Sequence, residues 1–465
     1  MAGIPDISGA NVLVLGLGVS GMAAAVLARL HGAQVTVLDE ADSDRLQERA
    51  RRLTAKDVDV HLECCDAALA PPPALAVISP GIGPATALGR LAANLDCPVI
   101  SELELGYRFC HCPLLAVTGT NGKTTTVELV THCLKAAGKR VVAAGNIGLP
   151  LCEAVRKSGA LDFIVAEVSS FQLERIHAFA PLAAACLNVT SDHLDRYDNA
   201  EAYLRTKLEI FRNIQNPARA VLSRTLWDDA RVQAHAAFAG GRPTLFAAEA
   251  EVDTDYLLDA DGNLCRRTEG GFEALLEPAD LRLAGRHNMA NTLAALAICR
   301  AAGVPEEPVI EAMPRFVTSA HRFELLSVSN GVRYINDSKA TNPDAMLQAL
   351  QSCRDDAEYP GEIILIAGGR DKDMDFDSVT PALRRGVREV CLLGETRETL
   401  AQLWGDTVPC RTCVSMRAAV NRAVEDARPG DTVLLSPGCA SFDMFDCYQD
   451  RGKEFVNALK RRLEP

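Results

Sequence analysis

The segment that decides the fold reads LLAVTGTNGKTTT and runs from Leu114 to Thr126. Its first part, Leu114–Thr118, is an apolar run, and Val127–Ala137 after the loop has the pattern of a helix. The backbone N–H groups of such a strand–loop–helix unit cradle phosphates. The loop lysine can neutralise charge on the β- and γ-phosphates, and Thr124 can offer its hydroxyl to Mg²⁺. This segment therefore predicts an ATP site, although its loop is shorter than the common GxxxxGK[ST] pattern.

The same order of apolar run, turn and helix recurs along the chain. Asn11–Leu15, Phe163–Val168 and Glu362–Ala367 are further examples of such apolar runs. Continuous apolar runs are typical of parallel strands that helices cover on both faces. We therefore expect an α/β protein, and the 465 residues suggest about three domains.

The predicted domains are residues 1–110, 111–316 and 317–465. The first boundary follows from the segment Cys110–Pro113, which precedes a new strand. The second lies within Met313–Ser319, after a helical stretch that begins near Asn288. We expect a mainly parallel sheet flanked by helices in each domain: Rossmann-like at the N-terminus, P-loop-like in the centre and Rossmann-like at the C-terminus.

Composition excludes several classes of protein. A formal net charge of −13 argues against a nonspecific nucleic-acid binder. The sequence has no uninterrupted apolar run of about 18 residues, so we do not expect a membrane span. No basic segment precedes the first apolar run, so we do not expect a secretion signal. The 16 cysteines are expected to be reduced thiols of a cytoplasmic protein. The single CxxC at Cys410 and Cys413 lacks the second ligand pair of a structural zinc site.

A second glycine-rich loop, GLGVSG at Gly16–Gly21, follows the strand Asn11–Leu15. The next strand, Val35–Leu38, ends at Asp39. This spacing fits the dinucleotide fingerprint, in which glycines admit a diphosphate and the acid meets a ribose hydroxyl. From the residues alone, the loop could hold NAD, hold another nucleotide diphosphate, or be a turn without a ligand.

Two further polar groups stand out against apolar surroundings. Glu167 lies near the end of an apolar strand, where a divalent cation beside ATP would compensate its buried charge. The strand Ala184–Val189 leads to His193, and both segments should meet at the carboxyl edge of one sheet. Lys207 shares a helix face with Leu204. From this spacing alone, a lysine that extends its ammonium to water is favoured, and a functional lysine is the alternative.

Together these segments resemble the Mur ligases of peptidoglycan precursor synthesis. The resemblance rests on GTNGKT at 119–124, EVSS at 167–170, NVTSDH at 188–193 and GRHNMAN at 285–291. HRFE at 321–324, NDSKATN at 336–342 and LSPGCASFD at 435–443 are similar to the D-glutamate-adding members. The resemblance implies an ATP-dependent ligase that joins D-glutamate to UDP-N-acetylmuramoyl-L-alanine through an acyl phosphate.

The resemblance also implies where each substrate binds. The positions implied for the UDP substrate are Val19, Ser20, Asp39, Ser79, Gly81, Asn146 and His193. Those implied for ATP are Gly119, Thr120, Asn121, Gly122, Lys123, Thr124, Thr125, Asn288, Asn291, Arg322 and Asp337. Those implied for D-glutamate are Lys339, Thr341, Lys372, Ser441 and Phe442. The sequence departs from the family at Tyr448, where a phenylalanine is often found, and in the acidic neighbours of Lys372.

The implied cofactors are two Mg²⁺ ions, the first at Thr124 and Glu167 and the second at His193 and Lys207. Lys207 matches a lysine that CO₂ carbamylates in this family, which replaces the interpretation from spacing. Lys123, His193 and Lys207 are the implied catalytic residues. We expect a monomer with small-molecule partners only, and neither nucleic acid nor membrane.

Three alternatives remain open at this point. An NAD-dependent dehydrogenase would use Gly16–Gly21 and Asp39, but it leaves Gly119–Thr124 without a purpose. A nucleotide-binding regulatory protein would bind ATP without turnover. Another Mur-type or folylpolyglutamate-type ligase would share the ATP site and differ in the acceptor.

Overall fold

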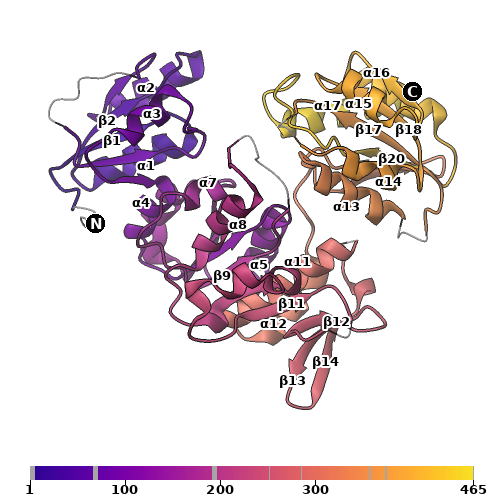
Figure 1. The fold of residues 1–465 in the computed structure, drawn as a ribbon, viewed down its shortest axis with the longest axis horizontal. Coiled ribbons are helices and arrows are strands. Elements are labelled where there is room, and N and C mark those ends of the chain that lie inside the picture. The colour runs from indigo at the N-terminus through magenta and orange to yellow at the C-terminus, as the bar shows by residue number, and fades with distance from the viewer. Residues whose placement is uncertain are drawn as a thin grey trace. The chain divides into compact units, whose positions relative to one another are not determined.

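The computed structural model describes residues 6–65, 72–190, 196–250, 252–283, 285–354, 358–371 and 374–463. The chain divides into two compact units. One comprises Met1–Val189, Glu201–Asp280 and Ala290–Arg315, and the other comprises Thr190–Ala200, Leu281–Met289 and Phe316–Pro465. The described residues form three sheets, with five, nine and six strands, that are mainly parallel (Figure 1). The predicted α/β class is therefore confirmed. Among these residues, no helix is long and apolar enough to cross a membrane.

The N-terminal sheet, indigo in Figure 1, has the order β3-β2-β1-β4-β5. Its parallel strands are β1 (Asn11–Leu15), β2 (Gln34–Leu38), β3 (Asp59–His61), β4 (Leu75–Ile78) and β5 (Val99–Ser101). Its helices are α1 (Val19–Leu30), α2 (Asp44–Thr54), α3 (Ala87–Ala93) and α4 (Glu102–Arg108). Residues of α1, α2 and α4 belong to the core on one face of the sheet, and those of α3 to the core on the other. This strand order is the Rossmann order that the glycine loop predicted.

The central sheet has the order β14-β13-β12-β11-β10-β9-β6-β8-β7. Its strands are β6 (Leu114–Thr118), β7 (Val141–Gly145), β8 (Phe163–Glu167), β9 (Ala183–Cys186), β10 (Ala220–Ser223), β11 (Thr244–Ala247), β12 (Tyr256–Leu258), β13 (Leu264–Thr268) and β14 (Gly271–Leu276). Its helices are α5 (Lys123–Ala136), α6 (Leu151–Ala154), α7 (Ser170–Leu173), α8 (Ala200–Leu208), α9 (Arg224–Trp227), α10 (Ala230–Gln233), α11 (Arg286–Ala301) and α12 (Glu306–Ala312). Because β6 lies between β8 and β9 and is buried along its whole length, the loop that follows it is held by strands on both sides.

The C-terminal sheet, orange to yellow in Figure 1, has the order β15-β16-β20-β17-β18-β19. Its strands are β15 (Glu324–Ser329), β16 (Val332–Asn336), β17 (Ile363–Gly368), β18 (Val387–Leu393), β19 (Cys410–Thr412) and β20 (Thr432–Leu435). The core on one face includes α13 (Pro343–Arg354), α14 (Thr380–Leu383) and α15 (Arg397–Trp404). The core on the other includes α16 (Met416–Asp426) and α17 (Tyr448–Leu463). The sheet is doubly wound as expected, but β20 lies between β16 and β17, so its strand order differs from that of the N-terminal sheet.

Helix α4 fastens the N-terminal sheet to the central one through two buried acids. Glu104 is 0% exposed and accepts hydrogen bonds from the backbone N–H groups of His177 (2.9 Å), Ala178 (2.9 Å) and Phe179 (3.0 Å). Glu102 accepts one at 2.6 Å from the N–H of Cys152, at the start of α6. Carboxylates that accept several backbone bonds are strong anchors. Both sheets accordingly belong to one unit, and the boundary predicted at residue 110 falls between α4 and β6.

Replacement of Glu102 by glutamine should stabilise the protein in a pH-dependent way. Burial raises the pKa of Glu102 from 4.5 to about 7. Between these values the folded protein holds a proton that the unfolded chain has lost, so the stability of the wild type falls as pH rises to about 7 and then levels off. Glu102→Gln removes this loss, so its advantage should grow to about 2–3 kcal/mol at pH 8. Urea unfolding at pH 5 and pH 8 measures it, with the exposed Glu153→Gln of α6 as the matched control. An equal effect of Glu102→Gln at both pH values would contradict the assignment.

Candidate active site

The loop between β6 and α5 is held rigid by two asparagines. Gly122 has φ of 82°, and a Cβ there would lie 2.2 Å from Asn291 Oδ1, so glycine is what allows Asn291 to approach. The Asn188 side chain accepts hydrogen bonds from the N–H groups of Thr120 (3.1 Å) and Asn121 (2.8 Å). It also donates to the carbonyl of Asn121 at 3.1 Å. The loop is therefore shaped before any phosphate arrives, as a phosphate cradle requires.

Two lysines meet at one carbonyl of this loop. Lys123 Nζ donates to the carbonyl oxygens of Gly119 (2.9 Å) and Thr120 (2.8 Å). Lys207 Nζ, from α8, donates to the same Gly119 oxygen at 2.8 Å and lies 4.5 Å from the ring centre of Tyr203. Lys207 is only 1% exposed, so its ammonium does not reach water and the interpretation from spacing alone is wrong. Lys207 instead bonds to the loop from α8.

Glu167 ends β8 beside this loop and is 2% exposed. Its carboxylate accepts hydrogen bonds from the Thr124 hydroxyl and from Asn146 Nδ2, the latter at 2.9 Å. The backbone N–H of Asn146 also donates to the Glu167 carbonyl at 2.9 Å. A buried carboxylate next to a hydroxyl supplies the hard oxygen ligands that Mg²⁺ prefers. The described residues thus bring together the pair expected at the first ion, whereas His193 lies outside them.

Helix α11 carries the two asparagines expected at ATP. Asn288 lies in its first turn and Asn291 follows three residues later, so they share a helix face. Both side chains are largely buried, at 7% and 5% exposure. Thr125 is the third residue of α5 and is also buried. Asn291 lies directly against Gly122 of the phosphate loop.

The N-terminal glycine loop is shaped by residues expected at the UDP substrate. A Cβ on Gly21 would lie 1.8 Å from the carbonyl oxygen of Gly16, so glycine lets α1 start against the loop. Asp39 accepts a hydrogen bond from the N–H of Leu17 at 2.6 Å, and Ser79 Oγ donates to the Gly16 carbonyl at 3.0 Å. Asp39 therefore orients the loop through its carboxylate. Val19 and Ser20 open the helix, and Gly81 follows Ser79 on the neighbouring turn.

In the C-terminal unit, the loops that follow β16, β20 and β17 are bonded to one another. The N–H of Gly438 donates to the Ala340 carbonyl at 3.0 Å, and that of Arg370 donates to Ala440 at 2.9 Å. These loops follow neighbouring parallel strands, so they meet at one edge of the sheet, where α/β proteins bind ligands.

The described residues expected at D-glutamate lie on these loops. Lys339 Nζ stands 4.2 Å from the ring centre of Tyr448, so this tyrosine contacts a predicted ligand residue. Ser441 is 3% exposed, and the next residue, Phe442, is 63% exposed. Thr341 is half-buried on the loop that carries Lys339. Lys372 lies outside the described residues.

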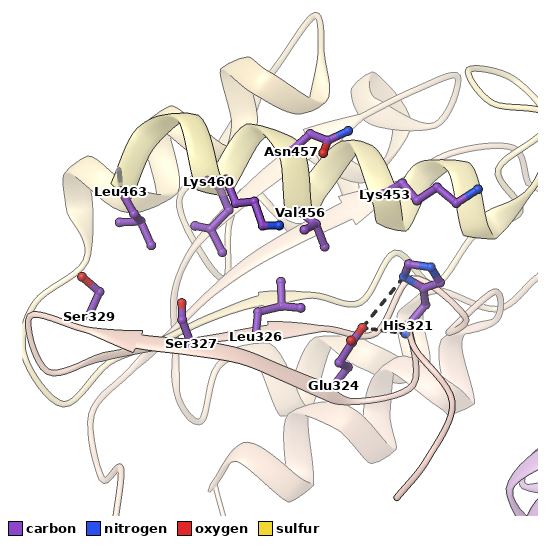
Figure 2. A pocket seen from close by; sticks show the side chains of 11 residues that line it. His321, Glu324, Leu326, Ser327, Ser329, Lys453, Val456, Asn457, Lys460 and Leu463 are labelled. Atoms are coloured by element: carbon purple, nitrogen blue, oxygen red, sulfur yellow. Dashed lines mark hydrogen bonds and ion pairs between the residues drawn. The ribbon is translucent and has the colours of Figure 1, made fainter. Parts of the chain in front are cut away.

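The segment of Arg322 is fixed by buried polar neighbours. Asp337 accepts hydrogen bonds from the N–H of Phe323 and from Ser436 Oγ, both at 3.1 Å, and burial raises its pKa to about 7. His321 donates its N–H to Glu324 at 2.8 Å, and its Nδ1 lies 2.8 Å from Asn336 Nδ2. His321 and Glu324 line a cavity of about 730 Å³. The cavity lies between β15 and α17 (Figure 2).

The sequence did not reveal Arg451, which joins two of the C-terminal loops. It lies on α17 and is 3% exposed. Its guanidinium donates to the carbonyls of Ser338 (2.7 Å) and Cys439 (2.9 Å) and to Ser338 Oγ (3.1 Å). The available signal was its helical spacing, because Arg451 shares a face with the apolar Phe455 and Leu459. Asn188 lies in the motif NVTSDH, but the sequence did not assign it to the site.

Replacement of Arg451 by lysine should loosen these loops without unfolding the unit. A lysine cannot reproduce the planar fork that reaches both loops, so two carbonyls lose charge-assisted bonds. Bonds of this kind contribute about 1.5–3 kcal/mol, so amide exchange at Gly438 and Lys339 should quicken by at least about 10-fold. Hydrogen–deuterium exchange measures this, with the exposed Arg461→Lys of the same helix as control. Unchanged exchange at both amides would show that Arg451 does not hold the loops.

Comparisons with known proteins agree with this arrangement. Residues 117–299 match the Mur ligase middle domain, and residues 321–439 match the Mur ligase, glutamate ligase domain. Residues 1–96 match the alanine dehydrogenase/PNT, C-terminal domain, and this range carries β1 to β4 of the N-terminal sheet.

Full-length relatives extend the match to the whole chain. The chain is 37% identical to the UDP-N-acetylmuramoylalanine–D-glutamate ligase of Caldicellulosiruptor saccharolyticus, covering 98% of this chain and 100% of the relative. It is 40% identical to that of Frankia casuarinae, covering 98% and 95%. Its fold is similar to that of MurF from Acinetobacter baumannii, with a TM-score of 0.62 at 18% identity over 98% and 91% of the two chains. On this evidence the chain belongs to the Mur ligase family.

Proposed function

We propose that this protein is the ATP-dependent ligase that joins D-glutamate to UDP-N-acetylmuramoyl-L-alanine in peptidoglycan precursor synthesis. The observation that carries the proposal is the similarity to D-glutamate ligases along nearly the whole chain. Lys339 supports it chemically, because an ammonium beside Tyr448 and the Ser441 loop suits a carboxylate of the incoming amino acid. The protein would act in the cytoplasm as a monomer on small-molecule substrates.

The proposed reaction has two steps. The carboxylate of the UDP substrate attacks the γ-phosphorus of ATP, ADP leaves and an acyl phosphate forms. The amine of D-glutamate then attacks the acyl carbon, and inorganic phosphate leaves. The ordered loop would hold the phosphates through its N–H groups, and Lys123 would exchange the carbonyls of Gly119 and Thr120 for phosphate oxygens.

The remaining roles follow the same assignment. Asn288, Asn291, Arg322 and Asp337 are assigned to ATP, together with the loop residues that the sequence predicted. Val19, Ser20, Asp39, Ser79, Gly81 and Asn146 are assigned to the UDP substrate, with His193. Thr341, Lys372, Ser441 and Phe442 are assigned to D-glutamate with Lys339.

Mg²⁺ fits the oxygen ligands that the described residues present. Thr124 and Glu167, already in contact, would hold one ion, and His193 with a carbamate on Lys207 would hold the second. When bound, the ions offset the repulsion between the substrate carboxylate and ATP. Within the described part of the chain, no group of three or more His, Cys, Asp or Glu side chains forms a complete site. Ligands from ATP would therefore complete the coordination.

Carbamylation of Lys207 would remove a conflict of charge. Lys207 and Lys123 bring two ammonium groups to the Gly119 carbonyl, which costs energy in a buried setting. Loss of a proton gives Lys207 a neutral amine, which attacks CO₂ and releases another proton to form an anionic carbamate. The product is a ligand for Mg²⁺ and a partner for Lys123. With 1% exposure, the adduct would be shielded from bulk water.

The amino-acid specificity provides the test of the proposed function. Phosphate release is measured with ATP, Mg²⁺ and UDP-N-acetylmuramoyl-L-alanine, adding D-glutamate, L-lysine or meso-diaminopimelate. We expect release with D-glutamate, and Lys339→Ala should raise its KM by about 10-fold or more because a charge-assisted contact is lost. The exposed Lys453→Ala of α17 is the control. Release with another amino acid would favour another Mur-type ligase, and use of folate substrates would favour a folylpolyglutamate-type ligase.

The carbamate assignment predicts chemical rescue. Lys207→Ala should nearly abolish ligation, by about 100-fold or more, because both the anion and its metal contact are lost. Acetate should partly restore turnover of this variant by placing a carboxylate in the vacated space. Lys123→Ala, which removes a cation, should gain nothing from acetate. Turnover of Lys207→Ala close to that of the wild type would refute the carbamate.

A further inference from the structure

Two thiols are in contact in the segment that joins α4 to β6. Cys110 and Cys112 have their Sγ atoms 3.9 Å apart, and Cys110 Sγ donates to the Cys112 carbonyl at 3.2 Å. Both residues are half-buried, so a small reagent can reach them. His111 between them is exposed and donates its N–H to Ser158 Oγ at 3.1 Å. The proposed ligase reaction uses none of these groups.

Two other cysteine pairs of the described chain lack this combination of contact and access. Cys391 and Cys413 interact through their thiols, but both are buried. Cys410 and Cys413, at the CxxC spacing, bond instead to the carbonyls of Val408 and Arg411. These pairs are internal comparisons for any reaction at Cys110 and Cys112.

The two neighbouring thiols differ in acidity. The pKa of Cys110 is lowered from 9.0 to about 7, because the Cys112 thiol can donate a hydrogen bond to the Cys110 thiolate. The pKa of Cys112 is raised by the same contact. A thiolate present near neutral pH is the nucleophile in disulfide exchange, and a neighbouring thiol can resolve the product. The geometry therefore provides both reactants.

We propose that Cys110 and Cys112 form a reversible disulfide by exchange with a low-molecular-weight disulfide such as oxidised glutathione. The Cys110 thiolate attacks one sulfur of glutathione disulfide and expels one glutathione thiolate. Cys112 loses its proton, its sulfur attacks Cys110 Sγ, and the second glutathione thiolate leaves. The two protein thiols are oxidised, and the glutathione disulfide is reduced to two thiols.

Ring size indicates that this bond would be a modification and not a structural staple. The disulfide would close a loop of only three residues, and the entropic stabilisation from a disulfide grows with loop length. The sulfurs must approach from 3.9 Å to about 2.0 Å, which strains so short a ring and makes it easy to reduce. Transient disulfides of this kind are the ones that a reducing compartment permits.

The full-length protein is equilibrated with mixtures of reduced and oxidised glutathione, alkylated and digested for mass spectrometry. In the wild type, the peptide that spans 110–112 should lose both alkylatable thiols together and regain them with dithiothreitol. Cys112→Ser should stop at a mixed disulfide of Cys110 with glutathione. Cys110→Ser should show neither product and should keep D-glutamate-dependent phosphate release, which establishes that it is folded.

Cys391 and Cys413, alkylated after denaturation, should remain reduced under the same conditions. The proposal is wrong if the wild-type peptide keeps both thiols at glutathione ratios that modify Cys110 in Cys112→Ser. It is also wrong if Cys110 resists glutathione in every variant, or if it pairs with another cysteine. A mixed disulfide that persists in the wild type would equally exclude Cys112 as the resolving thiol.

Discussion

The carbonyl oxygen of Gly119 accepts hydrogen bonds from two lysine side chains, and the elements around β6 hold the loop that presents it. The loop can present this carbonyl only because glycines at 119 and 122 adopt positive φ angles. Asn188 fixes the loop from the end of β9, and Asn291 closes over it from α11. An ordered loop that carries the Lys123 ammonium is a site preorganised for phosphate.

Buried charged groups also fix the elements around the site. Glu104 anchors α4 on three backbone N–H groups of the segment between α7 and β9, and Arg451 joins the loops after β16 and β20. Each charge is compensated by several hydrogen bonds, which is the condition under which burial is tolerated. Rigid placement of loops by such anchors allows half-buried groups such as Lys339 to meet a ligand in one orientation.

Local sequence patterns predicted the parts of the fold that depend on local physics. The strand Leu114–Thr118 was predicted with its observed bounds, because an apolar run that ends in a glycine loop fixes both ends. The strand predicted at Ala184–Val189 is observed at Ala183–Cys186, because the chain leaves the sheet so that Asn188 can hold the phosphate loop. That departure depends on a contact about 70 residues away, which local patterns do not encode.

The site was predicted only in part, because local patterns do not encode contacts between distant residues. Glycine and lysine spacing located the phosphate loop, whereas helical spacing placed the Lys207 ammonium in water and the structure buries it. The family resemblance supplied its role, and the contact with Gly119 is consistent with that role without testing it. Arg451 and Glu104 act across the fold, on partners that only the tertiary structure brings near. The Rossmann order of the N-terminal sheet was likewise predictable, but not which nucleotide it binds.

The central claim is that ATP activates the substrate carboxylate as an acyl phosphate before D-glutamate attacks. It is tested most directly with UDP-N-acetylmuramoyl-L-alanine whose carboxylate carries ¹⁸O. The account predicts that each inorganic phosphate released with D-glutamate acquires one oxygen from this carboxylate, because the carbon–oxygen bond of the acyl phosphate breaks in the second step. Phosphate that contains no oxygen from the labelled carboxylate, while the amide product forms, would contradict the account.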